Sequence, residues 1–127
     1  MKKKGSVLVV DDDRSVLRSL EILLEEEFEA VGTLLNPNLI PGSLESFRPD
    51  VILLDMNFTP GSDSGNEGLY WLREIRKKNE DVVVVMFTAY ADINLAVQAM
   101  KEGAMDFVMK PWNNDKLIST LHTAYRL

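Results

Sequence analysis

The sequence predicts an α/β fold in which helices cover both faces of a five-stranded parallel sheet. Short apolar runs alternate about five times with longer segments of helical periodicity. The runs contain few polar positions, as strands do when both of their faces are buried. Such alternation implies right-handed crossovers between parallel strands, and these place helices on both faces.

The first half of the chain supplies three of the predicted strands. Apolar residues from Val16 to Leu24 recur with the spacing of one helix face. Pro37, Pro41 and Gly42 interrupt the next helical segment, which we therefore expect to be short or irregular. The predicted elements are a strand at 6–10, a helix at 14–27, a strand at 29–34, a helix within 36–48 and a strand ending at Asp55.

The second half continues the alternation. Leu69, Leu72 and Ile75 mark the apolar face of a helix. Asp92 suits the N-cap of the following helix and Gly103 its C′ position. The predicted elements are a helix at 66–78, a strand at 82–87 followed by Thr88, a helix from Asp92 through Glu102, a strand ending at Lys110 and a helix at 113–126.

Composition narrows the class of protein. A chain of 127 residues is long enough for one domain with a real core, in which Met100, Met105 and Met109 are expected as filler. The net charge of −6 argues against direct binding to nucleic acid. No apolar stretch reaches the length of a membrane span or of a signal-peptide core. The absence of cysteine excludes disulfides and thiol catalysis, and the chain is expected to be cytoplasmic.

Three apolar runs stop at charged residues. Val7–Val10 leads into Asp11 and Asp12, a second run leads into Asp55, and a third leads into Lys110. If these strands are parallel and adjacent, the charges meet at one edge of the sheet, where ligands bind in such folds. Each pair of like charges 4 Å apart costs about 4 kcal/mol at an effective dielectric near 20, unless a cation offsets it. Oxygen ligands suit Mg²⁺, with Mn²⁺ as a substitute.

Each of these residues also has a purely structural interpretation. Asp11 and Asp12 could cap the first helix, Asp55 could end a strand at a turn, and Lys110 could be a surface lysine. Asp13 can cap the helix alone, however, and the combination of charges at three strand ends favours a site.

Four motifs occur in a fixed order at strand ends: Val-Leu-Val-Val-Asp-Asp at 7–12, Leu-Leu-Asp-Met-Asn at 53–57, Phe-Thr-Ala at 87–89 and Lys-Pro at 110–111. With this set the chain resembles the receiver domain of bacterial two-component response regulators over essentially its whole length. The resemblance implies a flavodoxin-like (βα)5 fold with strand order 2-1-3-4-5. Residues 88–92 and 103–107 most resemble the receivers of NtrC-type enhancer-binding AAA+ transcriptional regulators.

The resemblance also implies the chemistry of the site. Asp55 would be the phosphoacceptor, attacking a phosphohistidine of a sensor histidine kinase. Mg²⁺ would be held by Asp12, by Asp55, by the backbone carbonyl of Asn57, and by Asp11 through water. Lys110 would pair with Asp55 at rest and with a phosphoryl oxygen afterwards, and its bond to Pro111 would be cis.

Further roles follow from the same resemblance. The Thr88 hydroxyl and the Ala89 backbone N–H would donate to phosphoryl oxygens. Thr88 and Phe107 would form the switch, although Thr88 also suits a plain strand end and Phe107 a core position. Tyr90 would lean over the phosphoryl site and hinder attacking water.

The resemblance implies a single receiver domain at 1–127, either a stand-alone receiver or, as the NtrC-like details favour, the N-terminal part of a longer regulator. Its output would be an AAA+ ATPase plus a DNA-binding domain, controlled through the face of the fourth helix, fifth strand and fifth helix. A homodimer through that face is consistent with the family. No membrane contact and no direct contact with nucleic acid are expected. Beyond its own phosphorylation and dephosphorylation, the domain is expected not to be an enzyme.

Two rival functions stay open. A pseudo-receiver would use the same fold as a protein-interaction module without phosphorylation. The second rival is another class of α/β protein. It would be either an FMN binder, which the three aspartates at 11–13 disfavour, or an aspartyl phosphatase, which Asn57 disfavours. The segment 57–68 is longer than the usual receiver pattern and is interpreted as a flexible surface loop. The alternative is that it lies beside the phosphorylation pocket and limits which kinase or phosphatase can approach.

Overall fold

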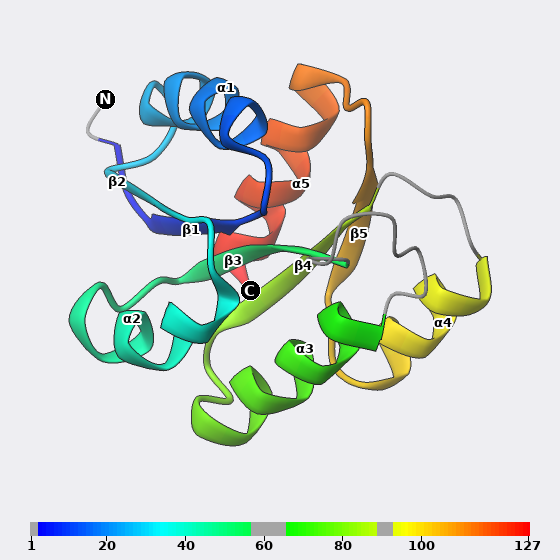
Figure 1. Cartoon of the computed structure of the whole chain (residues 1–127). Coiled ribbons are helices and arrows are strands. Elements are labelled where there is room, and N and C mark those ends of the chain that lie inside the picture. Colours follow the sequence, from blue (N-terminus) through cyan, green and yellow to red (C-terminus); the bar gives the residue numbers. More distant parts are fainter. Residues whose placement is uncertain (1–2, 57–65, 89–92) are drawn as a thin grey trace.

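The computed structural model describes residues 3–56, 66–88 and 93–127, which form a parallel five-stranded sheet between two layers of helices (Figure 1). The strand order is β2-β1-β3-β4-β5, as predicted. The strands are β1 (Ser6–Val10), β2 (Ala30–Leu34), β3 (Val51–Asp55), β4 (Val83–Thr88) and β5 (Asp106–Met109). Every pair of neighbouring strands is parallel.

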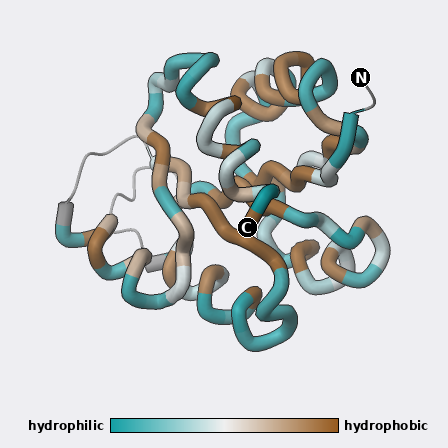
Figure 2. Tube along the Cα trace, turned by 180° about the vertical axis from the view of Figure 1, so that it is seen from behind, coloured by the Kyte–Doolittle hydropathy of each residue, from teal (hydrophilic) through white to brown (hydrophobic). Residues whose placement is uncertain are grey.

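Helices cover both faces of the sheet (Figure 1). The first face is covered by α1 (Arg14–Glu25) and α5 (Asn114–Arg126). The second is covered by α2 (Ile40–Ser46), α3 (Asn66–Lys78) and α4 (Ile93–Lys101), with a 3₁₀ turn at Pro37–Leu39 before α2. The most hydrophobic segments run through the sheet, while hydrophilic residues mark the outer sides of the helices (Figure 2).

Two hydrophobic cores, one on each face, follow from the alternation of side chains along the strands. In β3, Val51 and Leu53 belong to the core under α1 and α5, whereas Ile52 and Leu54 belong to the core under α2, α3 and α4. All four are fully buried. This explains the continuous apolar runs, because both faces of the central strands are covered.

Most predicted elements are confirmed, with small shifts at their ends. The interrupted second helix begins as the 3₁₀ turn, with Pro37 at its first position. Gly103 follows α4 with φ +109°, the left-handed conformation of a C′ glycine. The fifth strand ends at Met109 and not at Lys110. The predicted N-cap Asp92 lies outside the described residues.

The placement of two methionines in the core was wrong. Met100 and Met109 are 45% and 43% exposed, whereas Met105 is partly buried against the core under α1 and α5. The reason is their position: β5 is an edge strand, and Ala99 is the one buried side chain that the structure describes in α4. Within the residues described here, no helix is long and apolar enough to cross a membrane.

Candidate functional site

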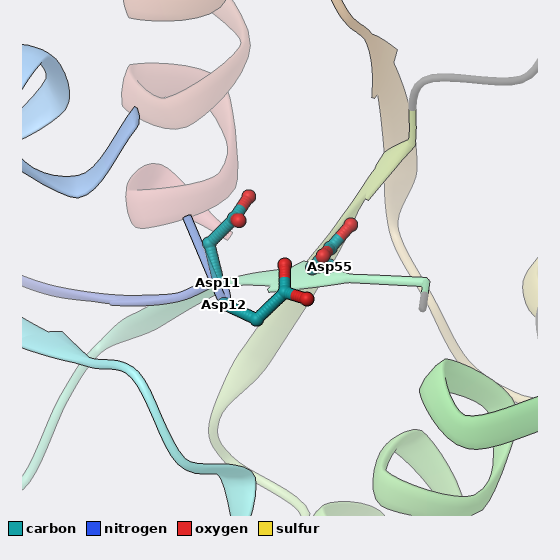
Figure 3. Close-up of side chains that lie close together, drawn as sticks. All are labelled: Asp11, Asp12 and Asp55. Carbon is teal, nitrogen blue, oxygen red and sulfur yellow. The ribbon is translucent and has the colours of Figure 1, made fainter. Parts of the chain in front are cut away.

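The register of the sheet brings the predicted carboxylates together. Val10 of β1 pairs with Leu54 of β3, so Asp11 and Asp55 leave the sheet side by side at its carboxyl edge. Both side chains are buried, with Asp11 0% and Asp55 5% exposed, whereas Asp12 is exposed. Figure 3 shows the three carboxylates gathered at the ends of β1 and β3.

Lys110 reaches this pair from the end of β5, although β4 lies between β5 and β3. Its Nζ is 2.5 Å from Oδ2 of Asp11 and 3.3 Å from Oδ1 of Asp55. The expected pairing with Asp55 is therefore present, but it is shared with Asp11. The predicted cis bond between Lys110 and Pro111 is also present.

Burial and charge shift the pKa values of these groups. Burial, followed by the neighbouring charge of Asp11, raises the pKa of Asp55 to about 7, against the opposing effect of Lys110. Burial and the charge of Asp11 also raise the pKa of Asp12. For Lys110, burial alone would lower the pKa, but the bond to Asp11 and the charge of Asp55 outweigh it, so the pKa is raised. The negative charge of the three carboxylates is thus only partly balanced by the Lys110 ammonium.

The three carboxylates fit a divalent cation. One oxygen from each of Asp11, Asp12 and Asp55 lies within 4.8 Å of the other two. In the described part of the chain, Asp11 Oδ2 is buried and accepts no hydrogen bond of regular geometry, so only the Lys110 ammonium balances it. An all-oxygen donor set with excess negative charge suits Mg²⁺.

Asp11 and Asp12 are not needed to cap α1, because another residue does so. Asp13 is the N-cap of α1 and accepts hydrogen bonds from the backbone N–H groups of Ser15 and Val16. One oxygen of Asp11 accepts from the Asp13 N–H at 3.0 Å, which holds the carboxylate in place. The sequence argument that Asp13 can cap the helix alone is confirmed.

Gly68 contributes to the site, and sequence reasoning missed it. Its N–H donates to the Met56 carbonyl at 2.8 Å, and a Cβ on it would lie 2.6 Å from Met56 Cα. The Met56 N–H in turn donates to Asp55 Oδ1 at 2.9 Å. The close approach of α3 to β3 therefore requires glycine and holds the backbone beside Asp55. The sequence signal was a glycine early in a predicted helix.

Thr88 and Phe107 lie around one small cavity. Thr88 ends β4, is 8% exposed and pairs with Met109 in the sheet, while Phe107 is partly buried on β5. The cavity measures about 10 Å³ and is otherwise lined by Met56, Met86, Leu95, Ala96 and Ala99. The structure thus places Thr88 and Phe107 beside the same cavity, which has room for about one water molecule.

Asn57, Ala89 and Tyr90 lie outside the described residues, as does most of the segment 57–68.

Residues 7–122 match the family model of the response regulator receiver domain. The chain belongs to this family. Receiver domains are signalling domains of two-component systems, and the relatives of this one include NtrC-type transcriptional regulators. The chain is 34% identical over 122 residues to the DNA-binding transcriptional regulator NtrC of Salmonella typhimurium, a match that covers 96% of the chain but 25% of NtrC. It is 29% identical to the transcriptional regulatory protein FixJ of Bradyrhizobium diazoefficiens, of which it covers 59%.

Solved receiver domains have the same fold. The N-terminal signal receiver domain of a two-component response regulator from Bacteroides fragilis is 48% identical, with a TM-score of 0.86 and coverage of 96% of this chain and 97% of that one. The receiver domain of NtrX from Brucella abortus is 29% identical, with a TM-score of 0.83 and coverage of 94% and 98%.

Proposed function

We propose that this receiver domain accepts a phosphoryl group on Asp55 from a phosphohistidine of a sensor histidine kinase. The observation that carries the proposal is the position of Asp55. Its buried carboxylate lies beside two further carboxylates, Asp11 and Asp12, and next to the Lys110 ammonium. A pseudo-receiver would not need this arrangement, since buried like charges destabilise a fold unless they serve a ligand.

Asp55 acts as the nucleophile. Its Oδ1 is held by the Met56 N–H and the Lys110 ammonium, so the other carboxylate oxygen, Oδ2, is the one that we assign to the attack. Oδ2 attacks phosphorus, an O–P bond forms, and the P–N bond breaks with its electron pair going to the imidazole nitrogen. The product is an acyl phosphate.

The attack requires the ionised form of Asp55. With a pKa of about 7, a substantial fraction of Asp55 is protonated at neutral pH without a cation. Mg²⁺, or Mn²⁺ in its place, would be held by Asp12, Asp55 and the backbone carbonyl of Asn57, and by Asp11 through water, and it would neutralise charge on Asp55 and the phosphoryl oxygens. Lys110 supplies the second positive charge and pairs with a phosphoryl oxygen of the product.

Phosphorylation of Asp55 leads to a conformational change that begins at Thr88. Its hydroxyl, together with the Ala89 N–H, donates to the new phosphoryl group, and Tyr90 limits the access of water to it. As Thr88 moves toward the phosphoryl group, it vacates space next to the small cavity that it shares with Phe107, and Phe107 turns into that space. This changes the face of α4, β5 and α5.

The altered face controls an output domain and can support a homodimer. The chain spans a quarter of the length of NtrC, which supports a receiver at 1–127 followed by an AAA+ ATPase and a DNA-binding domain. Regulation of transcription is the proposed result.

Intact mass spectrometry tests the proposal. Wild type, Asp55→Asn and the control Asp115→Asn, on the exposed first turn of α5, are incubated with phosphoramidate with and without Mg²⁺. We expect one phosphoryl group on wild type and Asp115→Asn only with Mg²⁺, and none on Asp55→Asn. A folded wild type that gains no mass would favour the pseudo-receiver.

A further inference from the structure

Four side chains at the carboxyl edge project to the same side of the sheet. Val9 and Leu53 belong to the core under α1 and α5. Asp11 and Asp55 lie two residues further along their strands and so project to that side. Phe87 belongs to the same core, and so does Val108, two residues before Lys110.

This arrangement forces Lys110 to cross a strand. Asp55 pairs with Phe87 in the register of β3 and β4, and Thr88 pairs with Met109 in the register of β4 and β5. Neighbouring strands are about 4.8 Å apart, so Lys110 must span about two such spacings to reach Asp55. The residue that it crosses is Phe87.

The ring of Phe87 lies beneath the lysine. Nζ of Lys110 is 4.8 Å from the ring centroid, and Phe87 is 0% exposed. Trp112 packs on the same ring at a centroid distance of 5.6 Å and an interplanar angle of 57°. Trp112 Nε1 donates to Asn114 Oδ1 at 2.9 Å. The ring is therefore enclosed, with its neighbour held by a hydrogen bond.

We propose that Phe87 is a positioning residue for phosphoryl transfer, whose ring face holds the Lys110 ammonium between Asp11 and Asp55. The inference rests on the proposed function, in which Lys110 pairs with the phosphoryl group. The negative face of an aromatic ring attracts an ammonium, and more strongly where water is excluded. The Lys110 side chain is 17% exposed, so much of the water is removed.

An aliphatic residue could fill the same space but could not attract the charge. Without the ring, the ammonium is free to move toward Asp11, the closer of its two carboxylate partners. It would then be displaced from the position in which it meets the transferred group. The defect would lie in the transfer step and not in donor binding, because the contact with phosphoryl oxygen strengthens during transfer.

Fluorinated phenylalanine separates ring charge from packing. Replacement of Phe87 by 3,4,5-trifluorophenylalanine keeps the ring shape and weakens its negative face. The matched control places the same residue at Phe28, which is 1% exposed in the same core and stacks on His122. The maximal rate of phosphorylation by phosphoramidate with saturating Mg²⁺ is measured by intact mass, together with the donor concentration that gives half of it.

We expect the trifluoro variant at position 87 to lower the maximal rate about fivefold, with the half-maximal donor concentration unchanged. Phe87→Leu should lower the maximal rate further, and Phe87→Tyr should keep most of the wild-type rate. The variant at position 28 should behave as wild type. Equal rates for the two fluorinated variants would overturn the proposal, as would a Leu variant as fast as the Tyr variant.

An NMR measurement tests the placement of Lys110 without phosphorylation. The ring current of Phe87 should shift the ε-methylene protons of Lys110 upfield in wild type, and this shift should be lost in Phe87→Leu but kept in Phe28→Leu. If wild type keeps the shift but cannot be phosphorylated, the proposed function fails, and a role for Phe87 in transfer fails with it. If wild type is phosphorylated but shows no such shift, only the role of Phe87 is overturned.

Discussion

The Lys110 ammonium lies closer to Asp11 than to Asp55, at 2.5 Å from Asp11 Oδ2 and 3.3 Å from Asp55 Oδ1. One cation therefore serves two buried carboxylates, of which Asp11 is fully enclosed. Such a site has unbalanced negative charge before any ligand arrives. Its stability, its pH dependence and its response to Mg²⁺ should all reflect that imbalance.

Lys110→Met should destabilise the domain in a pH-dependent way. Removing one partner of a buried ion pair leaves the other charge uncompensated, which costs about 3 kcal/mol. The loss should be largest at pH 8 and smaller at pH 5, where Asp55 becomes protonated. Urea unfolding in EDTA at the two pH values measures it, with Lys116→Met at an exposed position of α5 as the control. An equal loss at both pH values would contradict this explanation.

Asp55 should make the metal-free domain less stable as pH rises from about 4 to 7. Its pKa is about 7 in the folded state against 3.8 for an ordinary aspartate, so the folded state binds more protons in this window. Stability is then lost as pH rises through the folded pKa. The difference in unfolding free energy between wild type and Asp55→Asn should fall across the window and level off above it. A constant difference would show that the pKa of Asp55 is not raised.

Mg²⁺ should reverse this trend. The ion binds the ionised carboxylates, so its affinity rises as Asp55 loses its proton. Thermal unfolding is measured with and without roughly 10 mM MgCl₂, a concentration that would occupy a weak metal site. The rise in Tm on adding Mg²⁺ should be larger at pH 8 than at pH 5. The rise should be much smaller in Asp12→Asn. A rise independent of pH would place the ion elsewhere.

Gly68→Ala should disturb both stability and phosphorylation. The new Cβ would lie 2.6 Å from Met56 Cα, so α3 must move away from β3, at a cost of about 1–3 kcal/mol. Phosphorylation should slow because the Met56 N–H donates to Asp55. The control is Gly42→Ala in α2, where a Cβ meets nothing within 4 Å. That change should stabilise the domain by about 0.5–1 kcal/mol. Urea unfolding and the phosphoramidate assay distinguish the two variants.

Arg73 should restrain α4. Its guanidinium pairs through Nε and Nη2 with both carboxylate oxygens of Glu102, and Gln98 donates to the same carboxylate at 3.0 Å. Ala99 is the one buried side chain described in α4, and Leu95 is partly buried against the same core, so this exposed pair adds a link between α3 and the end of α4. Arg73→Gln should increase amide hydrogen exchange in α4 about two- to fivefold with little change in Tm.

The control for that measurement is Arg18→Gln, which removes a comparable surface pair with Glu21 within α1. Exchange in α4 should then be unchanged. If Arg73→Gln also leaves exchange in α4 unchanged, the ion pair does not hold the helix.

Much of the fold could be predicted because the patterns involved are local. Apolar runs located the strands and apolar residues at helical spacing located the α-helices, with small shifts at their ends, and Gly103 marked the end of α4 through its backbone freedom. The exposure of Met100 and Met109 could not be predicted. Whether a methionine is covered depends on which strand is at the edge and how closely a helix packs, and neither is a property of the local sequence.

The sequence by itself determined which residues form the site. Asp11, Asp12, Asp55 and Lys110 were identifiable because a charge that directly follows a buried strand must emerge at the carboxyl edge of a parallel sheet. The resemblance to receiver domains added the strand order and the pairing of Lys110 with Asp55, and only the tertiary structure decided the further contacts. The position of β4 between β3 and β5 carries Lys110 across Phe87, and the approach of α3 makes Gly68 part of the site. These contacts join residues far apart in the chain, so they depend on strand order and register, which no local pattern specifies.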